Sequence, residues 1–249
     1  MKHILITRPR AQADDFAEKL RSAGFEPIFF PVIEIQPIEN NVALERALEK
    51  LNCYEWVVFT SVNAVDVVFD EYSVFFLEEN IRVKFAAIGP KTAEALRKYS
   101  IEPDFIPEEY IAEAILPALG DLQGKWVLLP RAEIARKALP EAIANVGGIA
   151  HEITVYKTLP AQVDKDGLSA LKSGVDVITF TSASTVENFV AIARQHNLDP
   201  LNLPNNPLFA CIGPITEQAA REAGIQNLVD ANEYTTDGLL EAITRLEKS

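Results

Sequence analysis

Short apolar runs alternate with amphipathic stretches along the whole chain. In the first such stretch Ala13, Phe16, Ala17 and Leu20 fall on one helical face, and Gly24 ends it. A strand, a helix and another strand at this spacing predict parallel βαβ units with helices on both faces of the sheet, a doubly wound α/β fold. The expected strands are ILIT (4–7), WVVF (56–59), KFAAI (84–88), WVLL (126–129), VITF (177–180) and LFACI (208–212).

The second half of the chain repeats the first at a nearly constant offset of 121 to 124 residues. The junction FTSVNAV (59–65) returns as FTSAST (180–185). Three separate blocks keep the offset, which indicates an internal duplication with a period too long for a solenoid. The matched residues are Arg8, Leu20 and Gly24 with Arg131, Ile143 and Gly147; Ser61 and Val65 with Ser182 and Val186; and Gly89, Pro90, Thr92, Arg97, Ile101 and Tyr110 with Gly213, Pro214, Thr216, Arg221, Ile225 and Tyr234.

Length and charge narrow the class of protein. A chain of 249 residues predicts two modest domains, at roughly 100–200 residues per domain. The formal net charge of -13 argues against a nucleic-acid partner, which needs a basic face. No apolar run reaches the roughly 18 residues that span a bilayer, and the start MKHILITRPR lacks an export signal. These features predict a cytoplasmic protein with no membrane partner.

Metal and nucleotide chemistry have no motif in this sequence. The histidines His3, His151 and His196 are scattered, and the two cysteines, Cys53 and Cys211, are expected to be buried free thiols. The IGP junctions at 88–90 and 212–214 match neither a GxGxxG nor a Walker loop. The sequence therefore predicts no metal and no cofactor.

Four repeated residues stand where predicted strands end and helices begin: Ser61, Gly89, Ser182 and Gly213. Free N–H groups and the positive end of the helix dipole attract carboxylates at such positions, and ligands of open α/β sheets bind beyond the carboxyl ends of the strands. The alternative is purely structural. The serines then cap helices, and the Gly-Pro pairs form turns with proline in the first helical turn and glycine where close approach or positive φ is needed.

Arg8 and Arg131 follow equivalent predicted strands. Both side chains can point into one ligand cleft, or both can form surface salt bridges.

Tyr156 breaks the repeat, because its partner is Ile33. It lies in ITVYKT (153–158), where strand alternation predicts that it faces away from Val155. The segments 31–40 and 153–160 read as extended connectors with matched prolines, Pro37 and Pro160. A tyrosine there is either an amphipathic packing residue or a phenol that donates a hydrogen bond or a proton.

Over essentially its whole length the chain resembles the uroporphyrinogen-III synthase family. Order and spacing of the landmarks carry the resemblance, since no single motif is specific. The landmarks are ITRP (6–9), VVFTSVNAV (57–65), AIGPKTAEAL (87–96), VLLPRAEIARKAL (127–139), ITVYKT (153–158), ITFTSASTVENF (178–189) and CIGPITEQAAREAG (211–224).

The resemblance implies two α/β/α lobes joined by a two-stranded ladder. One lobe comprises residues 1–34 and 159–249, the other comprises 38–152, and 33–40 with 153–160 form the ladder. Such a hinge lets a cleft open and close.

The resemblance also implies a cofactor-free reaction. Linear hydroxymethylbilane loses water and closes to uroporphyrinogen III with ring D inverted, in tetrapyrrole biosynthesis. Tyr156 matches the family's tyrosine, which assists departure of hydroxide. The pyrroles themselves supply the nucleophile and stabilise the cation.

The substrate carries eight carboxylates, which the resemblance assigns to helix N-termini and arginines of both lobes. The expected binding residues are Arg8, Ser61, Val62, Asn63, Gly89, Pro90, Lys91, Thr92, Arg131, Ser182, Ala183, Ser184, Gly213, Pro214 and Thr216. Pro130 and Ala132 stand where many relatives carry glycines, which weakens the case for a backbone anion contact beside Arg131. Transient contact with hydroxymethylbilane synthase is the implied macromolecular partnership.

Two other classes of function remain open at this point. One is a non-catalytic bilobal binding protein or sensor domain, which has no need of Tyr156. The other is an α/β enzyme acting on a phosphorylated metabolite, for which glycine-rich phosphate loops are missing.

Overall fold

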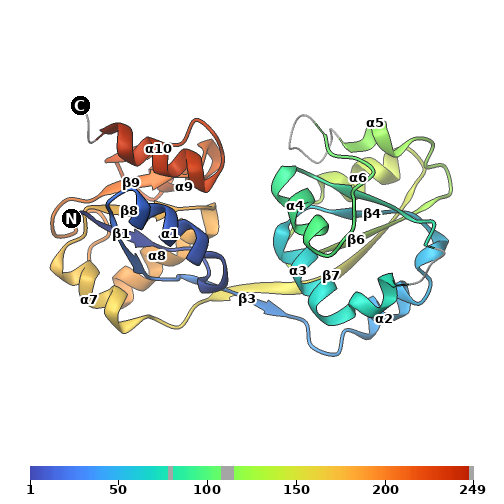
Figure 1. Cartoon of the computed structure of the whole chain (residues 1–249), viewed down its shortest axis with the longest axis horizontal. Coiled ribbons are helices and arrows are strands. Elements are labelled where there is room, and N and C mark those ends of the chain that lie inside the picture. The colour runs from blue at the N-terminus through green and yellow to red at the C-terminus, as the bar shows by residue number, and fades with distance from the viewer. Residues whose placement is uncertain (78–80, 108–114, 247–249) are drawn as a thin grey trace. The chain divides into compact units, whose positions relative to one another are not determined.

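The computed structural model describes residues 1–77, 81–107 and 115–246 and divides the chain into two compact units (Figure 1). Unit 1 comprises residues 1–34 and 159–249, and unit 2 comprises residues 35–158. Tyr110, the predicted counterpart of Tyr234, lies outside the described residues.

Unit 1 is built on a five-stranded parallel sheet with the order β10-β9-β8-β1-β2. Its strands are β1 (His3–Ile6), β2 (Glu26–Phe29), β8 (Val177–Phe180), β9 (Leu208–Cys211) and β10 (Leu228–Asp230). Its helices are η1 (Arg10–Gln12), α1 (Asp14–Ser22), α7 (Lys165–Ser173), α8 (Ala183–Gln195), α9 (Pro214–Glu222) and α10 (Thr236–Leu246).

Unit 2 carries a second sheet with the order β3-β7-β6-β4-β5. Its strands are β3 (Ile33–Pro37), β4 (Tyr54–Phe59), β5 (Lys84–Ala87), β6 (Trp126–Ala132) and β7 (Ile149–Pro160). The helices are α2 (Val42–Leu48), η2 (Leu51–Cys53), α3 (Val62–Tyr72), η3 (Ser73–Phe76), α4 (Pro90–Lys98), α5 (Leu116–Leu119) and α6 (Ala138–Asn145). The predicted strands and the helices after them are therefore confirmed.

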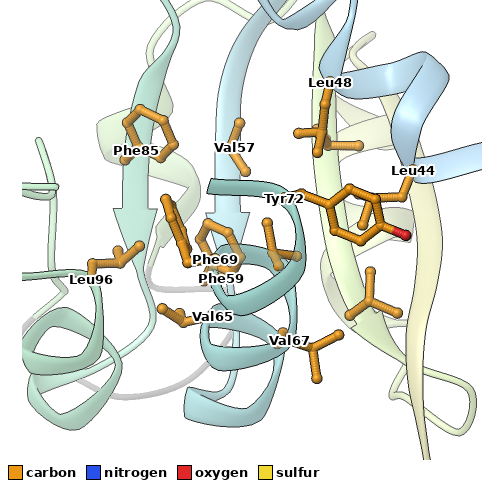
Figure 2. Packing of buried hydrophobic residues seen from close by; sticks show 14 of the residues in the cluster. Leu44, Leu48, Val57, Phe59, Val65, Val67, Phe69, Tyr72, Phe85 and Leu96 are labelled. Carbon is orange, nitrogen blue, oxygen red and sulfur yellow. The ribbon is translucent and has the colours of Figure 1, made fainter. Parts of the chain in front are cut away.

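Each sheet is covered by helices on both faces, as the apolar strands require. In unit 2 one core cluster joins α2, α3 and α4 to the sheet, and a second cluster on the other face involves α5 and α6. Figure 2 shows the first cluster, in which side chains of α2 and α3 meet those of β4 and β5. In unit 1, α7, α8 and α9 pack on one face and α1 and α10 on the other. The doubly wound α/β prediction is confirmed.

The duplication is visible in how the first helix of each repeat ends. Gly24 follows α1 with φ 88°, and its counterpart Gly147 follows α6 with φ 79°. Both glycines adopt the left-handed conformation that commonly closes a helix and that a side chain disfavours.

The strands β3 and β7 both run across the boundary between the units and are neighbours in the sheet. In unit 2 the Ile38 N–H donates to Val155 O at 2.9 Å, and in unit 1 the Ala161 N–H donates to Val32 O at 3.1 Å. From the first hydrogen bond to the second, the residue number falls on one strand and rises on the other, so the pair is antiparallel. The exact limits of the lobes and ladder, 38–152, 33–40 and 153–160, stay predictions.

Both cysteines are free, but only one matches its expected environment. Cys211 is buried in β9, where burial raises the pKa of its thiol to about 12. Cys53 is exposed because it ends η2 at the surface, so the expectation that it is buried was wrong.

Phe189 anchors the core of unit 1, because it is fully buried and lies edge-on to three other phenylalanines: Phe30, Phe180 and Phe209. We expect Phe189→Ala to lower the free energy of unfolding of unit 1 by about 3–5 kcal/mol, since it removes apolar burial and leaves a cavity. Urea unfolding followed by circular dichroism measures this change. Leu201→Ala, at a site that is 51% exposed, is the control and should cost about 0.5 kcal/mol or less. Equal losses in the two variants would contradict this view of the core.

Candidate functional site

The phenol of Tyr156 lies against the N-terminus of α3 in unit 2. Its Oη is 3.2 Å from Ser61 Oγ, and either oxygen can donate. The tyrosine is 6% exposed and belongs to the core cluster under α3, so its ring is fixed by packing. Sequence reasoning named both residues but missed the contact, because 95 positions separate them and no local pattern links a strand to a distant cap.

An irregularity in the pairing of β6 with β7 sets the direction of Tyr156. Arg131 pairs with Thr154, but the next residue, Ala132, pairs with Tyr156. One step on β6 thus matches two on β7, which is a β-bulge with Val155 as the extra residue. Val155 and Tyr156 are consequently buried in the same core cluster, and the prediction that they face opposite ways was wrong.

Ser61 and Ser182 are helix caps, as one of the two readings predicted. Ser61 Oγ accepts from the Ala64 N–H at 3.2 Å, and Ser182 Oγ accepts from the Thr185 N–H at the same distance. Ser182 forms a full capping box with Thr185 and also lies 2.9 Å from Ser184 Oγ. Of the two serines, Ser61 is the one that contacts Tyr156.

The Gly-Pro junctions begin α4 and α9 as expected, with proline in the first turn. Gly89 has φ -169° and Gly213 has φ 173°, so both are extended and neither needs positive φ. At Gly213 the reason for glycine is close approach, because a Cβ there would lie 2.9 Å from Tyr234 Cδ1. Sequence analysis paired Tyr234 with Tyr110 but gave it no such role.

The remaining residues of these helix starts differ in what they can offer a ligand. Thr92 and Thr216 are 5% and 4% exposed, so their side chains are directed into the protein. Lys91 is exposed and pairs with Glu94 at 3.1 Å. Pro90 and Pro214 are exposed, whereas Val62, Asn63, Ala183 and Ser184 are half-buried. The first-turn amides, rather than most of these side chains, are the polar groups that a helix start presents.

Arg8 follows β1 in unit 1 and is half-buried. One guanidinium nitrogen, Nη2, donates to Gln12 Oε1 at 3.4 Å, and the buried Nε has no partner among the described residues. Burial lowers the pKa of Arg8, and the charge of Asp15 partly offsets this. A buried donor without an acceptor is costly, which marks Arg8 as a group able to bind an anion.

Arg131, its counterpart in unit 2, is held by its own unit. It is 6% exposed, its Nη1 donates to Glu152 Oε2 at 2.8 Å, and its Nη2 donates to the carbonyl of Arg136. Its buried Nε, like that of Arg8, has no partner among the described residues. Lys137 binds the same Glu152 carboxylate. The ion pair is partly buried, since the Glu152 side chain is 30% exposed, and the use of Arg131 for substrate binding stays a prediction.

Among the described residues, histidine, cysteine and acidic side chains form no group of three or more that could hold a metal ion. None of the described helices is long and apolar enough to cross a bilayer.

Comparisons with known proteins agree over nearly the full chain. The family model for uroporphyrinogen-III synthase HemD matches residues 14–241. The uroporphyrinogen-III synthase of Synechococcus elongatus is 33% identical over 97% of this chain and 94% of its own length.

Two solved structures share the fold. Uroporphyrinogen-III synthetase from Helicobacter pylori has a TM-score of 0.68 at 20% identity, covering 99% of this chain and all of its own. A mutant uroporphyrinogen III synthase from Thermus thermophilus has a TM-score of 0.64 at 21% identity and full coverage of both chains. From the family match and the close relative, the chain belongs to the uroporphyrinogen-III synthase family.

Proposed function

We propose that this protein cyclises hydroxymethylbilane to uroporphyrinogen III with inversion of ring D and loss of water. Membership of the family supports the reaction, and the contact between Tyr156 and Ser61 supports a site for it in unit 2. A non-catalytic binding or sensor domain is not favoured, since relatives that match nearly the whole chain bear the name of the enzyme.

The reaction begins when the C–O bond of the terminal hydroxymethyl group breaks. Hydroxide takes a proton and leaves as water, and the pyrrole is left as an azafulvene cation. The substituted carbon of ring D attacks this cation and gives a spiro pyrrolenine, which fragments and recloses at the neighbouring carbon. Loss of a ring proton restores the aromatic pyrrole, so the net change is loss of one water. Unguided closure gives the uninverted isomer, so orientation of the chain is the main task of the enzyme.

Tyr156 is the group we propose to assist departure of hydroxide. Ser61 Oγ already accepts the Ala64 N–H, so its own proton can be donated to the phenol oxygen. That arrangement leaves the phenol O–H directed at a ligand and stabilises negative charge that develops on the oxygen when the proton moves. Ser61 would thus position the phenol and lower the cost of proton donation.

The substrate carboxylates are proposed to bind the first-turn amides and Arg8. Residues 61–63 and 89–92 supply amides in unit 2, and residues 182–184 and 213–216 supply them in unit 1. Each group stands at the carboxyl ends of its own sheet, where parallel strands place the starts of their following helices.

The proposals for the partner protein and for the cellular location are based on the sequence. We propose transient contact with hydroxymethylbilane synthase, which produces the unstable linear substrate, and a cytoplasmic setting. The acidic net charge disfavours a nucleic-acid partner.

Tyr156→Phe should lower kcat by about 10²-fold or more, because it removes the proposed proton donor and keeps the ring. The assay supplies freshly generated hydroxymethylbilane and separates the oxidised uroporphyrin isomers by chromatography. Tyr72→Phe is the matched control, since it removes another buried phenol of unit 2, whose oxygen accepts the Asn41 N–H. Unaltered turnover of Tyr156→Phe would remove the proposed donor, whereas formation of the type I isomer alone by the unmodified protein would reject the function.

Ser61→Ala and Ser182→Ala separate helix capping from catalysis. Each should lower the free energy of unfolding by about 1 kcal/mol, because each loses a cap. Only Ser61→Ala should also lower kcat, since only Ser61 contacts Tyr156. Urea unfolding and the isomer assay measure the two effects. An equal fall of kcat in both variants would show that the contact has no special part in the reaction.

Arg8→Gln should affect substrate binding, whereas Arg131→Gln should affect stability. Arg8→Gln should raise KM about tenfold with little change in kcat, as expected when binding is lost equally from ground and transition states. Arg131→Gln should lower stability by about 1–3 kcal/mol, because Glu152 and the carbonyl of Arg136 lose a donor. Steady-state kinetics and urea unfolding distinguish these outcomes, and a raised KM with full stability in Arg131→Gln would instead place that arginine among the binding residues.

A further inference from the structure

A cavity of about 460 Å³ lies at the edge of unit 2 where the strands start, away from the helix N-termini described above. Its lining comes from α2, η2 and the beginnings of β4, β6 and β7, which all lie in the same unit (Figure 1). On β7 the lining residue is His151, five residues before Tyr156. At about 3.3 Å per residue the two positions are about 17 Å apart along the strand. The cavity is thus separate from the proposed catalytic group.

Three aromatic rings form one side of the cavity. The rings of Tyr54 and His151 stack with centroids 5.9 Å apart, and Tyr54 Oη lies 2.6 Å from His151 Nδ1. Trp126 stands edge-on to both rings and remains 44% exposed. The hydrogen bond and the stacking fix the tyrosine and histidine, so the wall is formed before any ligand arrives. A partly exposed tryptophan on a preformed aromatic wall is typical of a site for a planar group.

Two cations also line the cavity. Arg46 lies on α2, and Lys50 lies in the turn between α2 and η2. Across the described residues neither forms an ion pair, whereas the nearby Lys84 and Lys125 both bind Glu55. An anion bound in the cavity would therefore meet two positive charges that no carboxylate of the described residues neutralises.

We propose that this cavity binds a planar aromatic anion, with its ring against Trp126, Tyr54 and His151 and its charged group between Arg46 and Lys50. Phosphate and carboxylate fit the two cations equally, so the anion is either a nucleoside phosphate or an aromatic carboxylate. The volume lies toward the lower end of the roughly 300–1,000 Å³ common for small-molecule sites, which suits one small ring system with a short charged arm.

Tryptophan fluorescence of the full chain tests the proposal. The protein has two tryptophans, and the other, Trp56, is 3% exposed, so quenching by a ligand reports on Trp126. The probes are AMP for the nucleoside phosphate and phthalate for the aromatic carboxylate. We expect a saturable change with at least one probe, lost in Trp126→Phe. Adenosine and inorganic phosphate, which carry the ring and the charge separately, should bind more weakly than AMP.

Charge variants supply the decisive comparison. Arg46→Gln with Lys50→Gln should weaken binding about tenfold or more. Lys165→Gln with Lys172→Gln, two exposed lysines of unit 1, changes the net charge by the same amount and should leave binding unchanged. Turnover in the isomer assay should stay unaltered in both pairs. The absence of a saturable change with both probes or equal weakening in the two pairs would overturn the proposal, as would, if AMP is the probe that binds, equal affinity for AMP and inorganic phosphate.

Cys53 gives a second reading that is independent of fluorescence. It lines the cavity and is the exposed one of the two cysteines, so a thiol reagent reacts there selectively. A bound ligand should slow this reaction in the unmodified protein and in the Lys165 and Lys172 variant, but much less in the Arg46 and Lys50 variant. Unchanged reactivity at a saturating concentration of the probe that quenches Trp126 would place that probe elsewhere.

Discussion

Parallel pairing of short, fully apolar strands is the constraint on which the rest of the structure depends. Such a strand must be covered on both faces, and each crossover to the next parallel strand needs a connection long enough for a helix. In both units these requirements give a three-layer arrangement with helices on either face of one sheet. All parallel strands of a sheet end at one edge, so each unit gathers several helix N-termini there. The anion-binding capacity of the protein thus follows from how its cores are built.

The two copies of the duplicated unit share their helix-capping serines but differ in the side chains around these serines. Ser61 and Ser182 both accept an N–H three residues on, yet Ser182 is surrounded by the hydroxyls of Ser184 and Thr185, while Ser61 meets a phenol. The arginines diverged as well. Both arginines keep a buried Nε without a partner in the described residues, but only Arg131 also forms an ion pair with a carboxylate, that of Glu152. Equivalent positions therefore serve a common structural need and differ in the chemistry that remains available.

Unit 2 also shows that the two edges of one sheet suit different ligands. At the edge where strands end, backbone amides and a phenol dominate. At the edge where strands begin, side chains of α2, β4, β6 and β7 provide the polar and aromatic groups. The carboxyl edge can hold several anionic groups through the backbone, whereas the opposite edge depends on particular residues such as Arg46, Lys50 and Trp126.

The sequence alone determined the α/β class, the positions of six strands and the helices that follow them, the repeated pattern and the helix caps. These features depend on periodicity and on local hydrogen bonds between residues a few positions apart, which a linear pattern records. Only the tertiary structure decided that Tyr156 turns toward Ser61, because a bulge opposite Ala132 overrides strand alternation. It likewise decided that Gly213 makes room for Tyr234, that Cys53 is exposed and that Arg131 is held by Glu152. Each of these outcomes depends on strand register or on contacts between distant segments. The local pattern of side chains predicts neither the register nor such contacts.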